Sequence, residues 1–169
     1  MKNRVPAFFI LILGCLLFVT GSEAQSSKED IVGTWSFVKN ETTRADGTKF
    51  DTYGAKPIGI LMFDSGGHFS LFIANTERLK FASGNRLDGR PEEYKAAVQG
   101  SISYFGKYSI DETAKTINFD IEGSSFPNWD GVTQKRPFTI TGDELRFTNT
   151  SGSSGGGVLV VLKRSHRVQ

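Results

Sequence analysis

An arginine stands at a position of the sequence where a core side chain is expected. Residues 134–147 read QKRPFTITGDELRF, and Gln134, Arg136 and Phe138 occupy alternate positions in this stretch. In an extended strand, alternate side chains leave the same face of the backbone. A buried face here would therefore carry a guanidinium among core residues. Burial of an unpaired cation is costly, so an Arg136 that no protein group satisfies favours an anionic partner such as a carboxylate.

Two tyrosines in a neighbouring segment could face the same interior. Tyr104 and Tyr108 fall in phase in SISYFGKYSID, residues 101–111. Ligand cavities are mostly apolar and hold a few placed polar groups, a role that a tyrosine hydroxyl suits. Both rings could equally be core filler, with their hydroxyls satisfied locally.

The sequence carries no recognisable catalytic, metal-binding or cofactor-binding motif. His68 and His166 are the only two histidines, too few and too far apart for a typical zinc site. The segment TSGSSGGG (150–157) is rich in glycine but lacks the lysine and the following helix of a phosphate-binding loop. A nucleophile elbow is also absent. We therefore predict no catalytic residues, no metal site and no cofactor.

The first residues have the organisation of an export signal. Lys2 and Arg4 precede an uninterrupted apolar run over residues 8–19, and Ser22–Ala24 places small residues where a signal peptidase reads. The run is too short to cross a bilayer comfortably, which takes roughly 20 apolar residues. We expect cleavage after Ala24, an exported product that is periplasmic or secreted, and no stable membrane insertion afterwards.

A lipid anchor on Cys15 is the alternative, because ILGC loosely resembles a lipoprotein box. Five apolar or neutral residues follow Cys15 before any polar tether begins, which argues against it. Removal of residues 1–24 leaves 18 basic and 17 acidic residues and no cysteine. No basic stripe suggests nucleic acid, and residues 25–169 have the length of one domain with a substantial core.

Short alternating segments separated by turn residues dominate the rest of the chain, which is typical of antiparallel β structure. The predicted strands are residues 31–41, 58–63, 68–74, 102–111, 115–123, 134–142, 144–150 and 158–165. One helix is predicted over 90–100, from its early proline, two glutamates in the first turn and closing glycine. About eight strands with a single inserted helix favour an all-β fold, a small closed antiparallel barrel.

Four motifs in order resemble one family. GTW (33–35) is similar to the glycine-x-tryptophan signature of lipocalins. The segments SYFGKYSID (103–111), FPNWDGVTQKRPF (126–138) and GDELRFTNT (142–150) resemble the bacterial and fungal lipocalin-like domain family. The resemblance implies a calycin-type barrel with an interior cavity and names no substrate.

The resemblance also gives Arg136 a structural alternative. In lipocalins an arginine commonly lies over the signature tryptophan and plugs the closed end of the barrel. Arg136, Arg164 or Lys163 could take that place over Trp35, where a guanidinium stacks well on an indole. The other readings place Arg136 in the cavity beside Gln134, or outside the barrel through a bulge at the following proline.

The loop FPNWDG (126–131) has two interpretations. Phe126 and Trp129 could lie at the barrel mouth and touch ligand, as exposed aromatic loop residues often do. Alternatively, the loop is a rigid turn and Trp129 packs onto the barrel wall.

We predict a carrier that binds a small, mostly apolar and possibly carboxylate-bearing molecule in the barrel. The cavity-lining candidates are Trp35, Phe37, Tyr104, Tyr108, Gln134, Arg136, Phe138 and Phe147, and the helix over 91–99 could lie across one opening as a lid. One alternative is a cofactor-free isomerase or cyclase, in which Arg136 and a tyrosine stabilise an oxyanion. A filled barrel that acts through its surface is another. The oligomeric state is unknown from the sequence.

Overall fold

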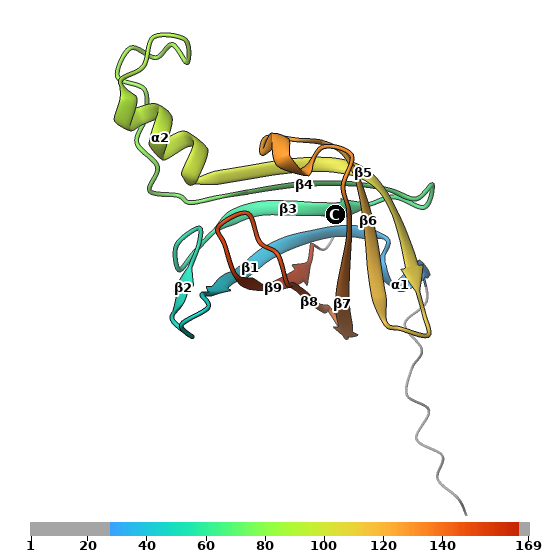
Figure 1. The fold of residues 1–169 in the computed structure, drawn as a ribbon. Helices are drawn as coiled ribbons and strands as arrows, with labels where there is room; N and C mark the ends of the chain where they lie inside the picture. Colours follow the sequence, from blue (N-terminus) through green and yellow to red (C-terminus); the bar gives the residue numbers. More distant parts are fainter. Residues whose placement is uncertain (1–27, 166–169) are drawn as a thin grey trace, which may run out of the picture.

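The computed structural model describes residues 28–165, which form a closed β-barrel with a projecting helical arm (Figure 1). The elements in chain order are α1 (Lys28–Ile31), β1 (Gly33–Thr43), β2 (Lys49–Asp51), β3 (Ile58–Phe63), β4 (His68–Ala74), α2 (Pro91–Gln99), β5 (Ser101–Asp111), β6 (Thr116–Ser124), the 3-10 turn η1 (Pro127–Trp129), β7 (Thr133–Thr141), β8 (Glu144–Asn149) and β9 (Gly157–Arg164). The eight predicted strands and the helix all form, with bounds within two residues of those predicted.

Antiparallel pairing between the first and last strands closes the barrel. The sheet order is β2-β1-β3-β4-β5-β6-β7-β8-β9, and β1 also pairs with β9 from Trp35↔Arg164 to Thr43↔Gly157. Eight strands make the wall, while short β2 pairs only with the end of β1. The predicted fold class, a small closed antiparallel barrel, is confirmed. Closure leaves the wall with no unpaired edge.

Alternation along the strands places aromatic side chains inside, where they fill one half of the barrel. Phe63 meets Tyr108 edge-on with ring centroids 4.8 Å apart, and Phe69 meets Phe119 in the same way at 4.8 Å. Phe119 also lies 5.9 Å from Phe147. Such pairs each contribute about 0.5–1.5 kcal/mol beyond the area they bury. This half, which we call the closed end, contains the β3–β4 turn and α1.

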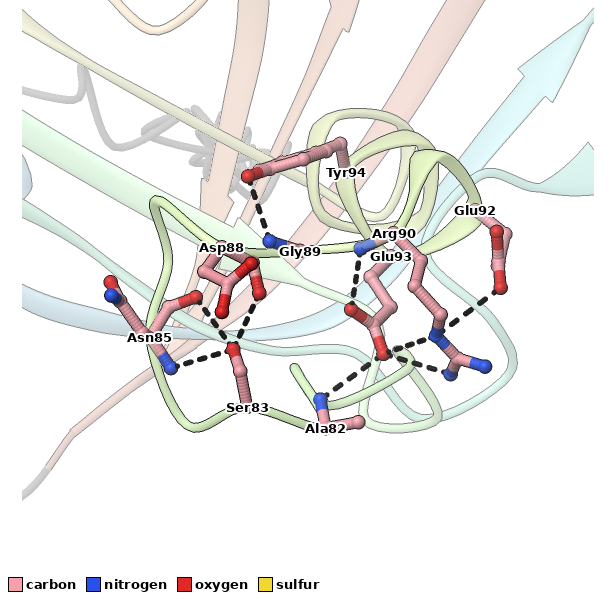
Figure 2. A network of polar contacts seen from close by, with 9 residues as sticks. All are labelled: Ala82, Ser83, Asn85, Asp88, Gly89, Arg90, Glu92, Glu93 and Tyr94. Carbon is pink, nitrogen blue, oxygen red and sulfur yellow. Dashed lines mark hydrogen bonds and ion pairs between the residues drawn. The ribbon is translucent and has the colours of Figure 1, made fainter.

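The opposite, open end carries the arm formed by residues 75–100. In Figure 1 the helix α2 stands away from the barrel rather than across its mouth, so the predicted lid is wrong. The cause is local: the loop before α2 packs against the helix itself. The buried carboxylate of Glu93 accepts hydrogen bonds from the backbone N–H groups of Ala82 at 3.1 Å and Arg90 at 2.9 Å, and pairs with the Arg90 guanidinium at 2.8 Å (Figure 2).

Over residues 28–165, no helix has both the length and the apolar character needed to cross a membrane. The predicted export signal, residues 1–24, lies outside the described residues.

Candidate functional site

Arg136 lies inside the barrel at the base of a small, partly open cavity, which we call the inner chamber. It occupies β7, and its side chain is 1% exposed. The inner chamber has a volume of about 40 Å³ and is lined by Phe37, Asn40, Thr52, Tyr53, Leu71, Ile73, Ile102, Tyr104, Trp129, Arg136, Asn149, Gly152, Ser153, Ser154, Val158 and Val160. The outward orientation of Arg136 that Pro137 suggested is therefore wrong: regular pairing of β7 with β6 continues through Pro137, so alternation is kept.

Neutral groups and aromatic faces hold the Arg136 guanidinium. Its Nη1 donates to the Tyr104 hydroxyl at 2.8 Å and its Nη2 donates to Gln134 Oε1 at 2.6 Å. The guanidinium carbon lies 4.4 Å from the ring centre of Phe119 and 5.3 Å from those of Tyr104 and Phe147. Cation–π contacts of this kind offset part of the cost of burying the charge.

Among residues 28–165, no carboxylate that lines the cavity neutralises the charge of Arg136. A guanidinium has five N–H donors; two are used here, and Nε has no hydrogen-bond partner in residues 28–165. No aspartate or glutamate lines the inner chamber in the described part of the chain. Buried polar atoms nearly always have partners. The Arg136 guanidinium can therefore donate hydrogen bonds to a ligand oxygen atom that carries negative charge.

Two asparagines extend the polar surface of the inner chamber. Asn149 on β8 donates from Nδ2 to Gln134 Oε1 at 3.2 Å, which fixes the amide that holds Arg136. Asn40 on β1 is 8% exposed and lines the cavity. The sequence analysis missed both. Asn149 is in phase with the buried Leu145 and Phe147, whereas Asn40 turns inward because β1 shifts register at a bulge between Phe37 and Lys39, which strict alternation does not predict.

Tyr53 and Ser153 cover the inner chamber from the open end, and the sequence analysis missed these residues too. Tyr53 follows β2, is buried, and shares a side-chain hydrogen bond with Ser153 in the glycine-rich loop. Burial, followed by the nearby Tyr104, raises the pKa of Tyr53 to about 12. Tyr53 therefore stays neutral at ordinary pH and cannot serve as a base.

Arg164, not Arg136, stacks on the signature tryptophan. Its guanidinium carbon lies 4.2 Å from the Trp35 ring centre. It donates to the Val32 carbonyl at 3.1 Å and the Asp30 carbonyl at 2.5 Å, while Trp35 Nε1 donates to the Ile31 carbonyl at 2.8 Å. The register decides between the candidates, because Arg164 is the residue of β9 directly opposite Trp35.

The predicted cavity residues separate into two groups. Phe37, Tyr104 and Arg136 line the inner chamber, and Gln134 supports Arg136 from the side. Four other candidates face inward without lining it, because they are packed in the filled core: Trp35, Tyr108, Phe138 and Phe147. Tyr108 lies toward the closed end, where its hydroxyl donates to the Asp64 carbonyl at 2.7 Å. A role in ligand binding stays a prediction for the first group.

The loop 126–131 packs onto the barrel wall and also lines the cavities, while its contact with a ligand stays a prediction. Trp129 packs edge-on against Tyr104 at 5.3 Å and lines the inner chamber. Phe126 packs against Trp129 at 5.7 Å and lines a second cavity at the open end. This second cavity, which we call the outer chamber, is adjacent to the inner chamber, and five residues line both.

No group of three or more histidine, cysteine, aspartate or glutamate side chains that could hold a metal ion occurs between residues 28 and 165. His68 lies 3.2 Å from Asp64 at the β3–β4 turn, with both side chains 58% exposed. His166 lies outside the described residues.

Comparisons with known proteins agree with the barrel fold. The model of the lipocalin-like domain family matches residues 32–161. A curated relative, the 4'-hydroxy-3'-methoxypropiophenone carrier protein of Aspergillus oryzae, is 35% identical over 68 residues, which is 37% of this chain. The match spans 61% of the length of that relative.

Proposed function

The chain belongs to the lipocalin-like domain family, and from that premise we propose that it is an exported carrier for one small, mostly apolar molecule. The ligand binds in the barrel with an acidic oxygen, such as a carboxylate, toward Arg136, and is not chemically transformed.

One observation carries the proposal: the barrel buries an arginine that no carboxylate of residues 28–165 neutralises. Arg136 is 1% exposed and bonded only to neutral side chains in the described part of the chain. A buried ion without a counter-charge is destabilising, and a ligand oxygen would relieve that cost. Tyr104 adds a hydroxyl at the same point, and the remaining lining is largely apolar.

The curated relative supports a small, mostly apolar ligand, and the compound in its name carries no carboxylate. Its name states that it carries 4'-hydroxy-3'-methoxypropiophenone, a small aromatic ketone with a phenolic hydroxyl. From this relative we carry over to our chain only the general chemistry of the ligand, which is an aromatic or aliphatic apolar part with one or two oxygen acceptors.

A carrier is favoured over the isomerase or cyclase by the groups around Arg136. Arg136 and Tyr104 are adjacent and could stabilise an oxyanion. General acid–base catalysis also needs a group that titrates near the working pH. No imidazole, carboxylate or thiol lines the inner chamber in residues 28–165, and burial holds the pKa of Tyr53 near 12.

Export is the part of the proposal that rests on residues 1–24 alone. Mass spectrometry of the protein recovered outside the cytoplasm should give the mass of a chain that begins at Gln25. A product that keeps residues 1–24, or one that carries lipid on Cys15, would contradict it.

The carrier proposal is tested by what the protein binds. Native mass spectrometry of protein purified from its own host should show one small molecule per chain. Purified, ligand-free protein should bind 3-phenylpropanoate or 4'-hydroxy-3'-methoxypropiophenone in isothermal titration calorimetry with one site. Absence of any co-purified molecule together with no measurable binding of either compound would overturn the proposal, and turnover of a bound compound would favour the enzyme.

A further inference from the structure

The inner chamber is too small to hold a whole ligand. A cavity needs at least about 10–15 Å³ for a single water, so its volume of about 40 Å³ has room for only a few waters or one small functional group. Sites for drug-sized ligands occupy about 300–1,000 Å³. The carboxylate of a ligand fits beside Arg136, whereas an aromatic ring does not.

The outer chamber has the volume that the inner one lacks. It measures about 540 Å³ and is lined by Arg44, Phe50, Thr52, Tyr53, Val98, Gln99, Ser101, Ile102, Ser125, Phe126, Ser153 and Ser154. Thr52, Tyr53, Ile102, Ser153 and Ser154 also line the inner chamber, so these five residues form the partition between the two. Molecules that reach Arg136 from the open end pass this partition.

The outer chamber combines aromatic faces with a second arginine. The Arg44 guanidinium carbon lies 4.2 Å from the ring centre of Phe50, and Phe126 lines the chamber from the loop before η1. No aspartate or glutamate lines this chamber in the described residues, so arginines are the only ionised side chains in both linings. A lining of this composition suits a ligand with a flat or aliphatic apolar part attached to an acidic group.

We infer that the outer chamber is the main binding site and takes the apolar body of the ligand, while the inner chamber receives only its acidic head. This inference rests on the proposed carrier function and adds to it the place and orientation of the ligand. It also assigns a role to the arm: the last turn of α2 supplies Val98 and Gln99 as one wall of the site. The helix is a side wall of the outer chamber rather than a lid.

Two exposed positions on the arm provide a matched test. Val98 is 74% exposed and lines the outer chamber, whereas Leu87 is 83% exposed and lines neither chamber. Because both side chains are mostly in solvent, Val98→Trp and Leu87→Trp should fold like wild type, which circular dichroism would check. The probe is 1-anilinonaphthalene-8-sulfonate, an aromatic anion whose fluorescence rises in apolar sites.

Val98→Trp should raise the Kd for the probe at least tenfold by filling the outer chamber, and Leu87→Trp should change it less than twofold. Gln99→Trp, which obstructs the same wall from the next position, should also raise the Kd. If the wild type binds the probe and both wall variants bind it equally well, the ligand body lies elsewhere and the inference is overturned while the carrier proposal stands. If the wild type binds neither this probe nor the two compounds above, the carrier proposal fails and this inference fails with it.

Discussion

Two arginines of the same barrel meet aromatic rings in different ways, and the difference decides their roles. Arg164 stacks on Trp35 and gives its donors to backbone carbonyls at the closed end. Arg136 also lies among rings, but it keeps N–H groups without a protein acceptor inside residues 28–165. The first arrangement completes the fold, whereas the second suits a ligand.

Replacement of each arginine by methionine should separate these roles. Arg164→Met should lower the free energy of unfolding by about 1–3 kcal/mol, because stacking contributes about 0.5–2 kcal/mol and the hydrogen bonds to carbonyls are lost as well. Arg136→Met should cost no more than about 1 kcal/mol, because the loss of its contacts with Tyr104, Gln134 and Phe119 is offset by removal of a buried charge that has no counter-ion among residues 28–165. Urea unfolding of the two variants checks this. A larger loss for Arg136→Met than for Arg164→Met would assign Arg136 to the fold.

Tyr53 gives the protein a specific sensitivity to alkali. Burial raises its pKa to about 12, whereas an unfolded tyrosine ionises near 10. The folded state therefore holds this proton more tightly: the stabilisation is complete below pH 10 and is lost as the pH rises through about 12. A difference of one pKa unit corresponds to about 1.4 kcal/mol. Between pH 9 and 12, the free energy of unfolding of the wild type should therefore fall by about 2–3 kcal/mol more than that of Tyr53→Phe. Equal losses in urea unfolding would show that Tyr53 ionises normally.

At the scale of elements, most of the barrel could be predicted from local patterns. The turn signals around 64–67 and 142–143 and the strict alternation along 102–110 determine strand bounds without any tertiary information. The elements that were missed are short: α1 has four residues, β2 three and η1 three. Segments of this length carry too few residues to show a period, and tertiary contacts hold them in place.

The candidate site was only partly predictable for a related reason. The alternation of side chains along each strand was enough to predict that Phe37, Tyr104 and Arg136 face the same interior. It could not choose between Arg136 and Arg164 as partners of Trp35, because that choice depends on the register of β9 against β1. Tyr53 and Ser153 lie in connections between strands, where no periodicity indicates which side chain turns inward.

The carboxylate of Glu93 joins the loop before α2 to the helix, so the order of the arm should be sensitive to acid. Hydrogen bonds from the backbone and then the side chain of Arg90 hold the pKa of Glu93 below its ordinary value. A carboxyl with a lowered pKa stabilises the folded arm above the ordinary pKa of glutamate, near 4.3. That stabilisation is lost as the pH falls through the lower value in the folded protein.

Both Glu93→Gln and protonation of Glu93 remove the negative charge of this side chain. The variant at neutral pH should therefore have a less ordered arm, as the wild type should in acid. Hydrogen exchange in residues 76–90, corrected for intrinsic rates, should be faster in Glu93→Gln at pH 7 and in wild type below pH 4, with the barrel strands still protected. Glu92→Gln is the matched control, because the Glu92 side chain is 53% exposed and the one contact drawn for it in Figure 2 is with Arg90. Exchange in Glu93→Gln equal to that of the control would show that other contacts of Figure 2, such as Ser83 with Asp88, are sufficient.

At the scale of the whole molecule, the filled core and the cavities lie toward opposite ends. The closed end holds the aromatic core and the Trp35–Arg164 stack. Toward the open end, residues of the wall strands line most of the inner chamber, while loops, β2 and the last turn of α2 supply most of the outer chamber. Substitutions of residues that line the outer chamber should therefore change ligand binding without removing contacts from the hydrophobic core. Function concentrated in loops on a rigid scaffold is the general arrangement of such folds.

This arrangement predicts that ligand charge determines how much a ligand stabilises the barrel. A ligand at 100 times its Kd stabilises the folded state by about 2.7 kcal/mol, which for a domain of this size corresponds to roughly 6–12 °C in the midpoint of thermal unfolding. At equal concentrations, 3-phenylpropanoate should raise the midpoint more than its neutral amide, 3-phenylpropanamide, because only the carboxylate neutralises Arg136. In Arg136→Met the two compounds should give equal, smaller shifts, since the body still binds. Equal shifts in the wild type would mean that Arg136 does not face the ligand, whatever the stability of the variant.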